Sequence, residues 1–417
     1  MSQKVRNLTP TEPDILGCPR CDLICRIGAV EIGQKAECPR CGYRLLGKSE
    51  YRADKLLAYS VTAIVLLIFA LTLDFIQYDS SGLTQSMTLL DAAWQLSYFH
   101  EKLLAVIVLL TVILYPLLYL FSLIAVFVAL KARASAIARY CLRLSSHVKP
   151  WLMVDVFLLG TLISLIKISG LANVQLKLGF WLFCGFVVLL LVTYYLVNTM
   201  NLWSVVGKRT TPSRDVKAGV TAHEQGYKVC EVCHRVVPFG VSDCPCCGDD
   251  IDRHWWRSPQ VTLALIVAAA VLLVPAHWLP IMETVRFGDA QPSTIIGGVV
   301  ELWQSGDAPI AVIVFVASLV IPVAKILALL GLMALARWQT PQAVNHRLVL
   351  YKITDWIGRW SMIDIFVVAI LVALVRSGTV MSVYPGSAAI AFGAAVVLTM
   401  LAAMSFDTRL FWREAKK

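Results

Sequence analysis

The sequence predicts an all-α polytopic membrane protein with two tandem repeats of four transmembrane helices, each preceded by a small cytoplasmic cysteine module. Three observations lead to this prediction. The chain is 58% hydrophobic and only 15% charged, whereas soluble domains are roughly 45–50% apolar and about 25% charged. Its apolar residues form runs that reach the ~20 residues needed to cross a bilayer as a helix. Its motifs also recur at a nearly constant offset.

We expect eight transmembrane helices, because apolar runs of this length do not alternate as the ~10-residue strands of membrane barrels do. Their predicted positions are 56–74, 103–130, 151–169, 179–202, 259–279, 308–335, 360–377 and 385–404.

The basic residues predict the orientation of these helices. Thirty-one of the 37 Lys and Arg residues lie in five polar segments: 1–55, 131–150, 203–258, 336–359 and 405–417. The loops on the opposite side carry only Lys177 and Arg286. Positively charged loops stay in the cytoplasm, so we expect both termini there. The net charge of +10 reflects this topology, and because it is scattered it does not indicate a nucleic-acid partner.

Internal similarity indicates a duplicated unit. The segment 88–116 matches 294–322 at an offset of 206, and "MNLW" ending at Trp203 corresponds to "RLFW" ending at Trp412. Three further pairs lie 209 positions apart: Trp151 and Trp360, Asp155 and Asp364, and Phe157 and Phe366. With four spans per half, both copies insert in the same direction, which predicts parallel repeats about an axis along the membrane normal.

Each half opens with two cysteine pairs of CxxC spacing. Such pairs are typical of tetrahedral zinc sites, and disulfides are disfavoured in the reducing cytoplasm. Four thiolates leave no open coordination position, so we expect two structural zinc ions rather than catalytic ones. Cys246 could replace Cys244, but Cys244 preserves the CxxC spacing. The predicted metal ligands are Cys18, Cys21, Cys38, Cys41, Cys230, Cys233, Cys244 and Cys247.

These boundaries define five predicted units. They are an N-terminal zinc ribbon at 1–55, a first four-helix unit at 56–202, a second ribbon at 203–258, a second four-helix unit at 259–404 and a cytoplasmic tail at 405–417.

A few charged residues fall inside the predicted spans, where charge usually marks a functional path. The candidates for transport or coupling are Asp364, Lys325, Asp155, Lys167 and Arg376. Arg376 and Lys167 lie near the periplasmic surface, where they can snorkel to water. Lys325 follows Pro322, a residue that tends to kink a helix and make room for polar groups.

Lys325 and Asp364 are predicted about 15 Å and about 7 Å from the cytoplasmic ends of their helices, and the long, flexible lysine side chain could reach a carboxylate on a neighbouring helix. Two interpretations remain for this pair. It could be a titratable element that couples proton movement to a conformational change, or Asp364 could form structural hydrogen bonds within the bundle.

Two segments on the side opposite the ribbons, 85–102 and 292–309, are too short and polar to span the membrane but too apolar to be free loops. We expect either interfacial or re-entrant helices, with Trp94 and Trp303 at headgroup level, or simple loop anchors.

Several motifs resemble those of the paraquat-inducible protein A family, which includes PqiA and LetA. They are the "CPRC" knuckles, "GRWSMID" at 358–364, "STIIGGVVELW" at 293–303 and "MSVYPG" at 381–386. The resemblance implies a Gram-negative cell inner-membrane protein that works with a periplasmic MCE-domain partner in intermembrane phospholipid transport. The family's functional positions match the eight cysteines, Lys325 and Asp364 of this chain. In the first half, Tyr119 stands at the position that corresponds to Lys325.

The sequence contains no Walker, HExxH or GxSxG motif, so we expect no enzyme activity. The resemblance implies a membrane subunit that passes phospholipid between the inner membrane and a periplasmic MCE-domain tunnel protein, and Asp364 and Lys325 are the candidates for coupling this transport to protons. Two alternatives remain. The cysteine clusters could serve a membrane redox or metal sensor, or the chain could be a passive membrane anchor for the MCE partner.

Overall fold

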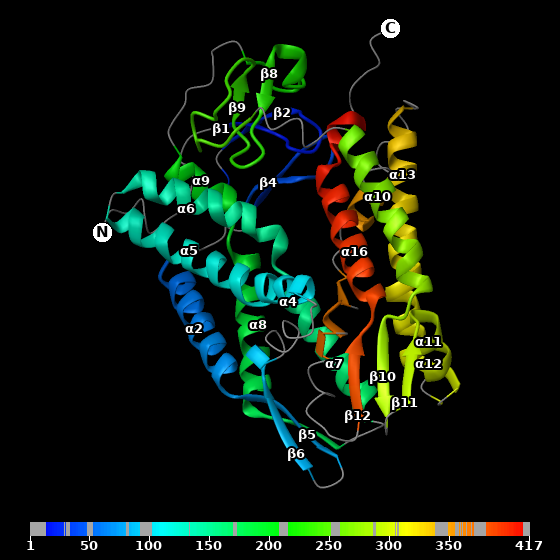
Figure 1. The fold of residues 1–417 in the computed structure, drawn as a ribbon. Coiled ribbons are helices and arrows are strands. Elements are labelled where there is room, and N and C mark those ends of the chain that lie inside the picture. The colour runs from blue at the N-terminus through cyan, green and yellow to red at the C-terminus, as the bar shows by residue number, and fades with distance from the viewer. Residues whose placement is uncertain are drawn as a thin grey trace.

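In the computed structural model of the protein, two cysteine-rich ribbons lie at one end of a bundle of long helices and two small β-sheets lie at the other (Figure 1). The structure describes residues 14–411 apart from 29, 31–33, 48–52, 81–82, 92–101, 133, 170–172, 208–215, 252–258, 287–288, 305, 307, 338–348, 355–357, 359, 361, 364, 368 and 371–380.

Short antiparallel hairpins form the ribbons. In the first ribbon β1 (Asp14–Gly17) pairs with β2 (Ile24–Ile27), and β3 (Lys35–Glu37) pairs with β4 (Arg44–Gly47). In the second, β8 (Tyr227–Val229) pairs with β9 (Val236–Pro238). The ribbons also bond to each other, because the N–H of Gly17 donates to the carbonyl of His234 at 3.0 Å. They therefore form a single cap on the bundle.

The helices of the first half are α2 (Ala53–Thr72), α4 (Lys102–Val108), α5 (Tyr115–Lys131), α6 (Ser135–Val148), α7 (Val154–Ser169), α8 (Leu178–Leu196) and α9 (Thr199–Val206). Those of the second half are α10 (Pro259–Trp278), α11 (Ile295–Gln304), α12 (Ala308–Phe315), α13 (Ile321–Arg337) and α16 (Ser387–Ser405), with further helical residues at 349–354 and between 358 and 370.

Seven helical stretches in the described part of the chain are long and apolar enough to cross a membrane. They are Asp54–Thr72, Ala105–Lys131, Ser135–Ile166, Leu178–Leu196, Pro259–Trp278, Ala311–Leu335 and Ser387–Ser405. Each overlaps one predicted span. The remaining predicted span, 360–377, is helical at most of the residues described up to 370, and its continuation lies outside the described residues.

The sequence analysis missed helix α6, which falls in the polar segment 131–150. Its buried residues, Ala138, Leu142, Ser145 and Val148, recur at helical spacing, as expected for an amphipathic helix with one face against the protein. This face packs against α5 and α9 (Figure 1). A turn of 3-10 helix at Lys149–Trp151 then leads towards α7.

Two three-stranded antiparallel sheets correct the expectation of helices or simple loops opposite the ribbons. The first comprises β5 (Asp74–Ser80), β6 (Leu83–Thr88) and β7 (Asn173–Leu176), and the second β10 (Met282–Arg286), β11 (Asp289–Ser293) and β12 (Met381–Pro385). The expected helix at 292–309 is present as α11, with Trp303 59% exposed. The segment 85–102 starts in a strand, and Trp94 lies outside the described residues.

Matching elements recur in the two halves. The strand orders are β6-β5-β7 and β11-β10-β12, so in each sheet the strand that comes first in the chain lies in the centre. A π-helical turn, Leu109–Leu114 or Val316–Val320, precedes Pro116 or Pro322 in each half. The wider turn accommodates the proline, whose ring would clash with the carbonyl four residues before it in an α-helix.

The two halves contact each other through α7 and the helical residues between 358 and 370. Phe157 and Phe366, which are 209 positions apart, stack edge to face with ring centroids 5.4 Å apart. The hydroxyl of Ser164 donates to the carbonyl of Val367 at 3.3 Å. A Cβ atom at Gly160 would lie 3.0 Å from the Cβ of Phe366. This glycine therefore allows the two helices to approach closely, as small residues do in membrane helix pairs.

Replacing Gly160 with Leu should force α7 away from its partner. Overpacking of a tight interface typically costs about 1–3 kcal/mol, so we expect Gly160→Leu to lower the midpoint of thermal denaturation in detergent. Gly331→Leu is the matched control, because a Cβ at Gly331 meets nothing within 4 Å. Equal midpoints for the two variants would contradict close packing at Gly160.

Candidate functional site

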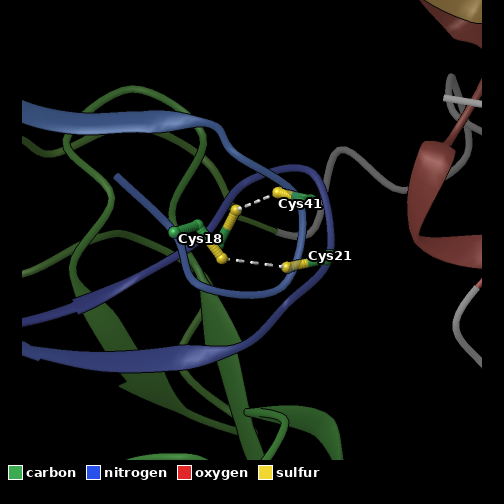
Figure 2. Close-up of side chains that lie close together, drawn as sticks. Cys18, Cys21 and Cys41 are labelled. Atoms are coloured by element: carbon green, nitrogen blue, oxygen red, sulfur yellow. Dashed lines mark hydrogen bonds between the residues drawn. The ribbon is translucent and has the colours of Figure 1, made fainter. Parts of the chain in front are cut away.

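The four N-terminal cysteines converge on one point of the first ribbon. Their sulfur atoms all lie within 4.8 Å of one another. The Sγ atoms of Cys18 and Cys41 are 3.4 Å apart (Figure 2). Those of Cys21 and Cys38 are 3.5 Å apart. Each CxxC pair sits in the tight turn of a hairpin.

The second ribbon repeats this arrangement. The Sγ atoms of Cys230 and Cys247 are 3.5 Å apart, as are those of Cys233 and Cys244, and all four side chains are buried. Gly248 follows the second pair with φ 73°, a left-handed conformation that glycine adopts without strain. The cluster of four cysteines that could hold a metal ion includes Cys244 rather than Cys246, as the sequence predicts.

Both clusters fit a tetrahedral divalent metal ion. A zinc ion with Zn–S bonds of about 2.3 Å separates its sulfur ligands by about 3.8 Å, close to the observed distances, whereas a disulfide needs about 2.05 Å. Crowding of the thiols raises the pKa of Cys21, first through its hydrogen bond with Cys18 and then through those with Cys38 and Cys41. A bound cation would offset the repulsion that opposes ionisation of the four thiols.

Side chains at the ribbon end of the bundle form hydrogen bonds between the ribbons and the helices. Asn201 of α9 donates its amide to the carbonyl of Gly47 at 2.7 Å, at the end of the first ribbon. In α6, His147 contacts Asp249 of the second ribbon, with Nε2 and Oδ1 3.2 Å apart, and Arg143 bonds to the carbonyl of Gly248. Both ribbons are therefore held close to the bundle.

Lys325 is buried inside the bundle, with 2% of its surface exposed. It lies one turn after Pro322 in α13, and its Nζ donates to the carbonyl of Gly358 at 3.5 Å. A Cβ atom at Gly358 would lie 2.7 Å from this Nζ. The first residue of the "GRWSMID" motif is therefore a glycine that leaves room for the ammonium group.

The buried lysine lines a cavity of about 260 Å³. Lys149 and Tyr194 line it together with Lys325 and Gly358, and Met400 and other residues of α16 complete the wall. The ammonium group of Lys149 lies 4.4 Å from the ring centroid of Tyr194, within the range of a cation–π interaction.

This lysine cavity adjoins a larger one of about 710 Å³ that reaches the ribbons. Five residues line both cavities: Ser146, Lys149, Pro150, Tyr194 and Met404. The larger cavity is also lined by Cys230 of the second metal cluster and by Arg44 of the first ribbon. A chain of cavities thus leads from beneath the ribbons to Lys325.

The other charged candidates are not brought together in the described part of the chain. Asp155 lies in the first turn of α7 and is half-buried. Lys167 lies near the end of α7, but its side chain is outside the description, and Asp364 and Arg376 lie outside the described residues. Pairing of Lys325 with Asp364 therefore stays a prediction.

Tyr119, which stands at the position of Lys325 in the first half, is also buried. Its hydroxyl has no hydrogen-bond partner in the part of the chain that the structure describes. The two halves therefore differ chemically at this position.

Sequence reasoning missed Lys149, Tyr194 and Arg409. In the sequence, Lys149 contributes only to the positive charge of the segment 131–150. Arg409 bonds to residues nearly 400 positions away, and local sequence gives no signal for such a contact.

The chain matches one known protein family and several named proteins. The sequence profile described as Paraquat-inducible protein A matches two segments, residues 53–206 and 260–416. The chain is 34% identical over 398 residues to the intermembrane transport protein PqiA of Escherichia coli strain K12, covering 95% of this chain and 94% of that protein.

Two further relatives are similar over nearly their whole lengths. Identity is 30% over 400 residues to the lipophilic envelope-spanning tunnel protein A of the same strain, covering 96% of this chain and 91% of that protein. It is 25% over 415 residues to a probable intermembrane transport protein of Haemophilus influenzae, covering 97% of each. No solved structure gives a significant match.

Metal content should distinguish the ligands from their neighbours. We expect two tightly bound metal ions per wild-type chain and one in Cys244→Ser, because a serine hydroxyl does not replace a thiolate ligand. Cys246→Ser is the matched control and should retain both ions. Elemental analysis of the purified chains gives the ratio, and loss of metal from Cys246→Ser but not from Cys244→Ser would contradict the assignment.

Proposed function

The chain belongs to the paraquat-inducible protein A family, and on this basis we propose that it is an inner-membrane subunit of an envelope lipid transport system. It would pass phospholipid between the inner membrane and a periplasmic MCE-domain tunnel protein. The names of the relatives, which include intermembrane transport and a lipophilic envelope-spanning tunnel, support this proposal. The seven long apolar helices agree with a multi-pass protein.

The observation that carries the proposal is the burial of Lys325. A lysine inside a membrane bundle is costly and usually faces a polar partner or a wet cavity on a transport path. Here it lines a cavity that adjoins a second one beneath the ribbons. In the proposed mechanism, protons reach Lys325 and Asp364 through these cavities, and a change in their charge repositions the helices on which they lie.

The proposed orientation places the ribbons and both termini in the cytoplasm and the two sheets in the periplasm. The distribution of Lys and Arg supports it, as does the separation of ribbons and sheets to opposite ends of the bundle (Figure 1). The sheets would then face the MCE-domain partner.

The proposed architecture is two parallel repeats related by an axis along the membrane normal. One family profile matches both halves, and the contact of Phe157 with Phe366 supports the symmetry. Residues that correspond to each other meet directly only near such an axis.

In this proposal the metal ions are zinc and their role is structural, because four cysteine ligands fill the tetrahedral shell. Cys18, Cys21, Cys38 and Cys41 would hold one ion, and Cys230, Cys233, Cys244 and Cys247 the other. The bound ion supplies folding energy that ribbons of this size cannot obtain from a core. The chain itself would catalyse no reaction.

One observation favours the alternative of a redox or metal sensor. A fifth buried thiol accompanies each cluster, Cys25 in the first ribbon and Cys246 in the second. A sensor would release metal under mild oxidant, whereas structural zinc would be retained. Metal content before and after oxidant therefore separates the two roles.

Lipid transfer by the reconstituted complex tests the proposal. With the MCE-domain partner bound, wild-type chain should move labelled phospholipid between donor and acceptor vesicles. Lys325→Met and Asp364→Asn should slow transfer roughly 100-fold or more, the scale of losing a proton-transfer group. Lys352→Met is the matched control, because Lys352 is exposed, and it should transfer normally.

Three outcomes separate the alternatives. Variants that still bind the partner but fail to transfer lipid exclude a passive anchor. Full transfer by Lys325→Met would contradict the coupling role of Lys325, and no transfer by wild-type chain with its partner would contradict lipid transport.

A further inference from the structure

The residues after the last membrane helix enter the space between the two ribbons. Helix α16 ends at Ser405, and Asp407, Thr408 and Arg409 are each less than 10% exposed. Charged residues are seldom buried to this extent unless they are paired. The segment therefore has specific partners. They lie in a CxxC turn of each ribbon, Cys18–Cys21 in the first and Cys230–Cys233 in the second, and each such turn is called a knuckle below.

The first partner is the loop between Cys18 and Cys21. The Nε of Arg409 donates to the carbonyl of Pro19 at 3.3 Å. The hydroxyl of Thr408 donates to the carbonyl of Arg20 at 3.1 Å. These two carbonyls belong to the two residues that separate the cysteines of the first knuckle.

The second partner is the knuckle that begins at Cys230. The Nη2 of Arg409 lies 3.4 Å from the carbonyl oxygen of Val229 and 3.4 Å from Oε1 of Glu231. Val229 and Glu231 flank Cys230 in the sequence. A single guanidinium group thus bonds to knuckle residues of both ribbons, which the planar fork of an arginine allows and a lysine would not.

Local bonds hold the arginine in this position. The carboxylate of Asp407 accepts a hydrogen bond from the N–H of Arg409 at 3.0 Å, and so caps the short helical turn Thr408–Phe411. In the first half, Asn198 accepts from the N–H of Met200 at 3.1 Å. Met200 corresponds to Arg409 at the offset of 209, so the cap is shared but the arginine is particular to the second half.

The charge of Arg409 suits metal-loaded knuckles. A divalent ion held by four thiolates leaves an excess of two negative charges on each cluster. A buried guanidinium between two such clusters is compensated by both, in addition to Glu231 and Asp407. Loaded ribbons should therefore hold the arginine more strongly than empty ones.

The same segment continues into the wall of the lysine cavity. Met400, Ala403 and Met404 of α16 line the cavity around Lys325, and Met404 and Arg409 both line the larger one. Movement of Arg409 would therefore move the helix end that encloses Lys325.

We propose that Arg409 couples the two metal sites to each other and to α16, so that loss of metal from either ribbon frees the cytoplasmic end of this helix. The proposal rests on metal binding by the two clusters, not on lipid transport. Its test therefore measures metal release and helix protection, so that its failure is distinct from failure of transport.

Metal release from the purified full-length chain tests the coupling between the sites. With a chromogenic chelator, wild-type chain should lose its two ions in one kinetic phase. In Arg409→Gln we expect two separate phases, the faster about tenfold quicker than wild type, the scale of hydrogen bonds to a charged group. Arg409→Lys should release metal at an intermediate rate, because lysine keeps the positive charge but lacks the planar guanidinium group that bonds to both ribbons.

Arg44→Gln is the matched control, because Arg44 lines the same cavity but is exposed, and it should behave as wild type. Identical release by wild type and Arg409→Gln, or equal acceleration in Arg44→Gln, would overturn the proposal.

Hydrogen exchange of wild-type chain provides a second test that does not depend on a folded variant. Residues 400–411 should exchange slowly in metal-loaded chain, and at least several-fold faster after chelation, whereas exchange in the centre of α8 should not change. Equal exchange of residues 400–411 with and without metal would overturn the proposal even if Arg409→Gln fails to fold.

Discussion

The main energetic constraint on the helix bundle is the ammonium group of Lys325, which is buried among apolar helices. Burying a charge in a low-dielectric interior costs several kcal/mol or more unless polar groups or water compensate it. The surroundings of Lys325 supply part of that compensation. The carbonyl of Gly358 accepts its hydrogen bond, the absent side chain of Gly358 leaves room, and the adjoining cavities lead to the ribbons. A helix with leucine at 325 would be easier to bury, so the lysine is expected to have a function that offsets its cost.

At the ribbon end of the bundle, hydrogen bonds between the ribbons and the helices add to the packing of buried apolar side chains. Helix α6 bonds to the second ribbon through Arg143 and His147, and α9 bonds to the first through Asn201. Arg409 then joins both ribbons to the last membrane helix. The larger cavity lies among these attachments. The two cysteine clusters therefore lie beside the cavities that lead to the lysine.

The sequence predicts this fold where the physical signal is local. Long apolar runs identify the helices that could cross a membrane. The CxxC spacing identifies the eight cysteines that form the two clusters, including Cys244 rather than Cys246. The β-sheets were missed because short strands in polar loops lack clear alternation, and their pairing, such as β5 with β7, joins distant segments. Helix α6 was missed because its charges conceal an apolar face. The roles of Lys149 and Arg409 depend on tertiary contacts, which composition and spacing do not encode.

The most direct test of the account is the response of lipid transfer to a proton gradient across the reconstituted membrane. Wild-type chain with the proposed MCE-domain partner should transfer phospholipid faster when a gradient is imposed, and the increase should vanish when an ionophore collapses it. A transfer rate that is the same with the gradient, without it and after its collapse would contradict a coupling function for the buried lysine.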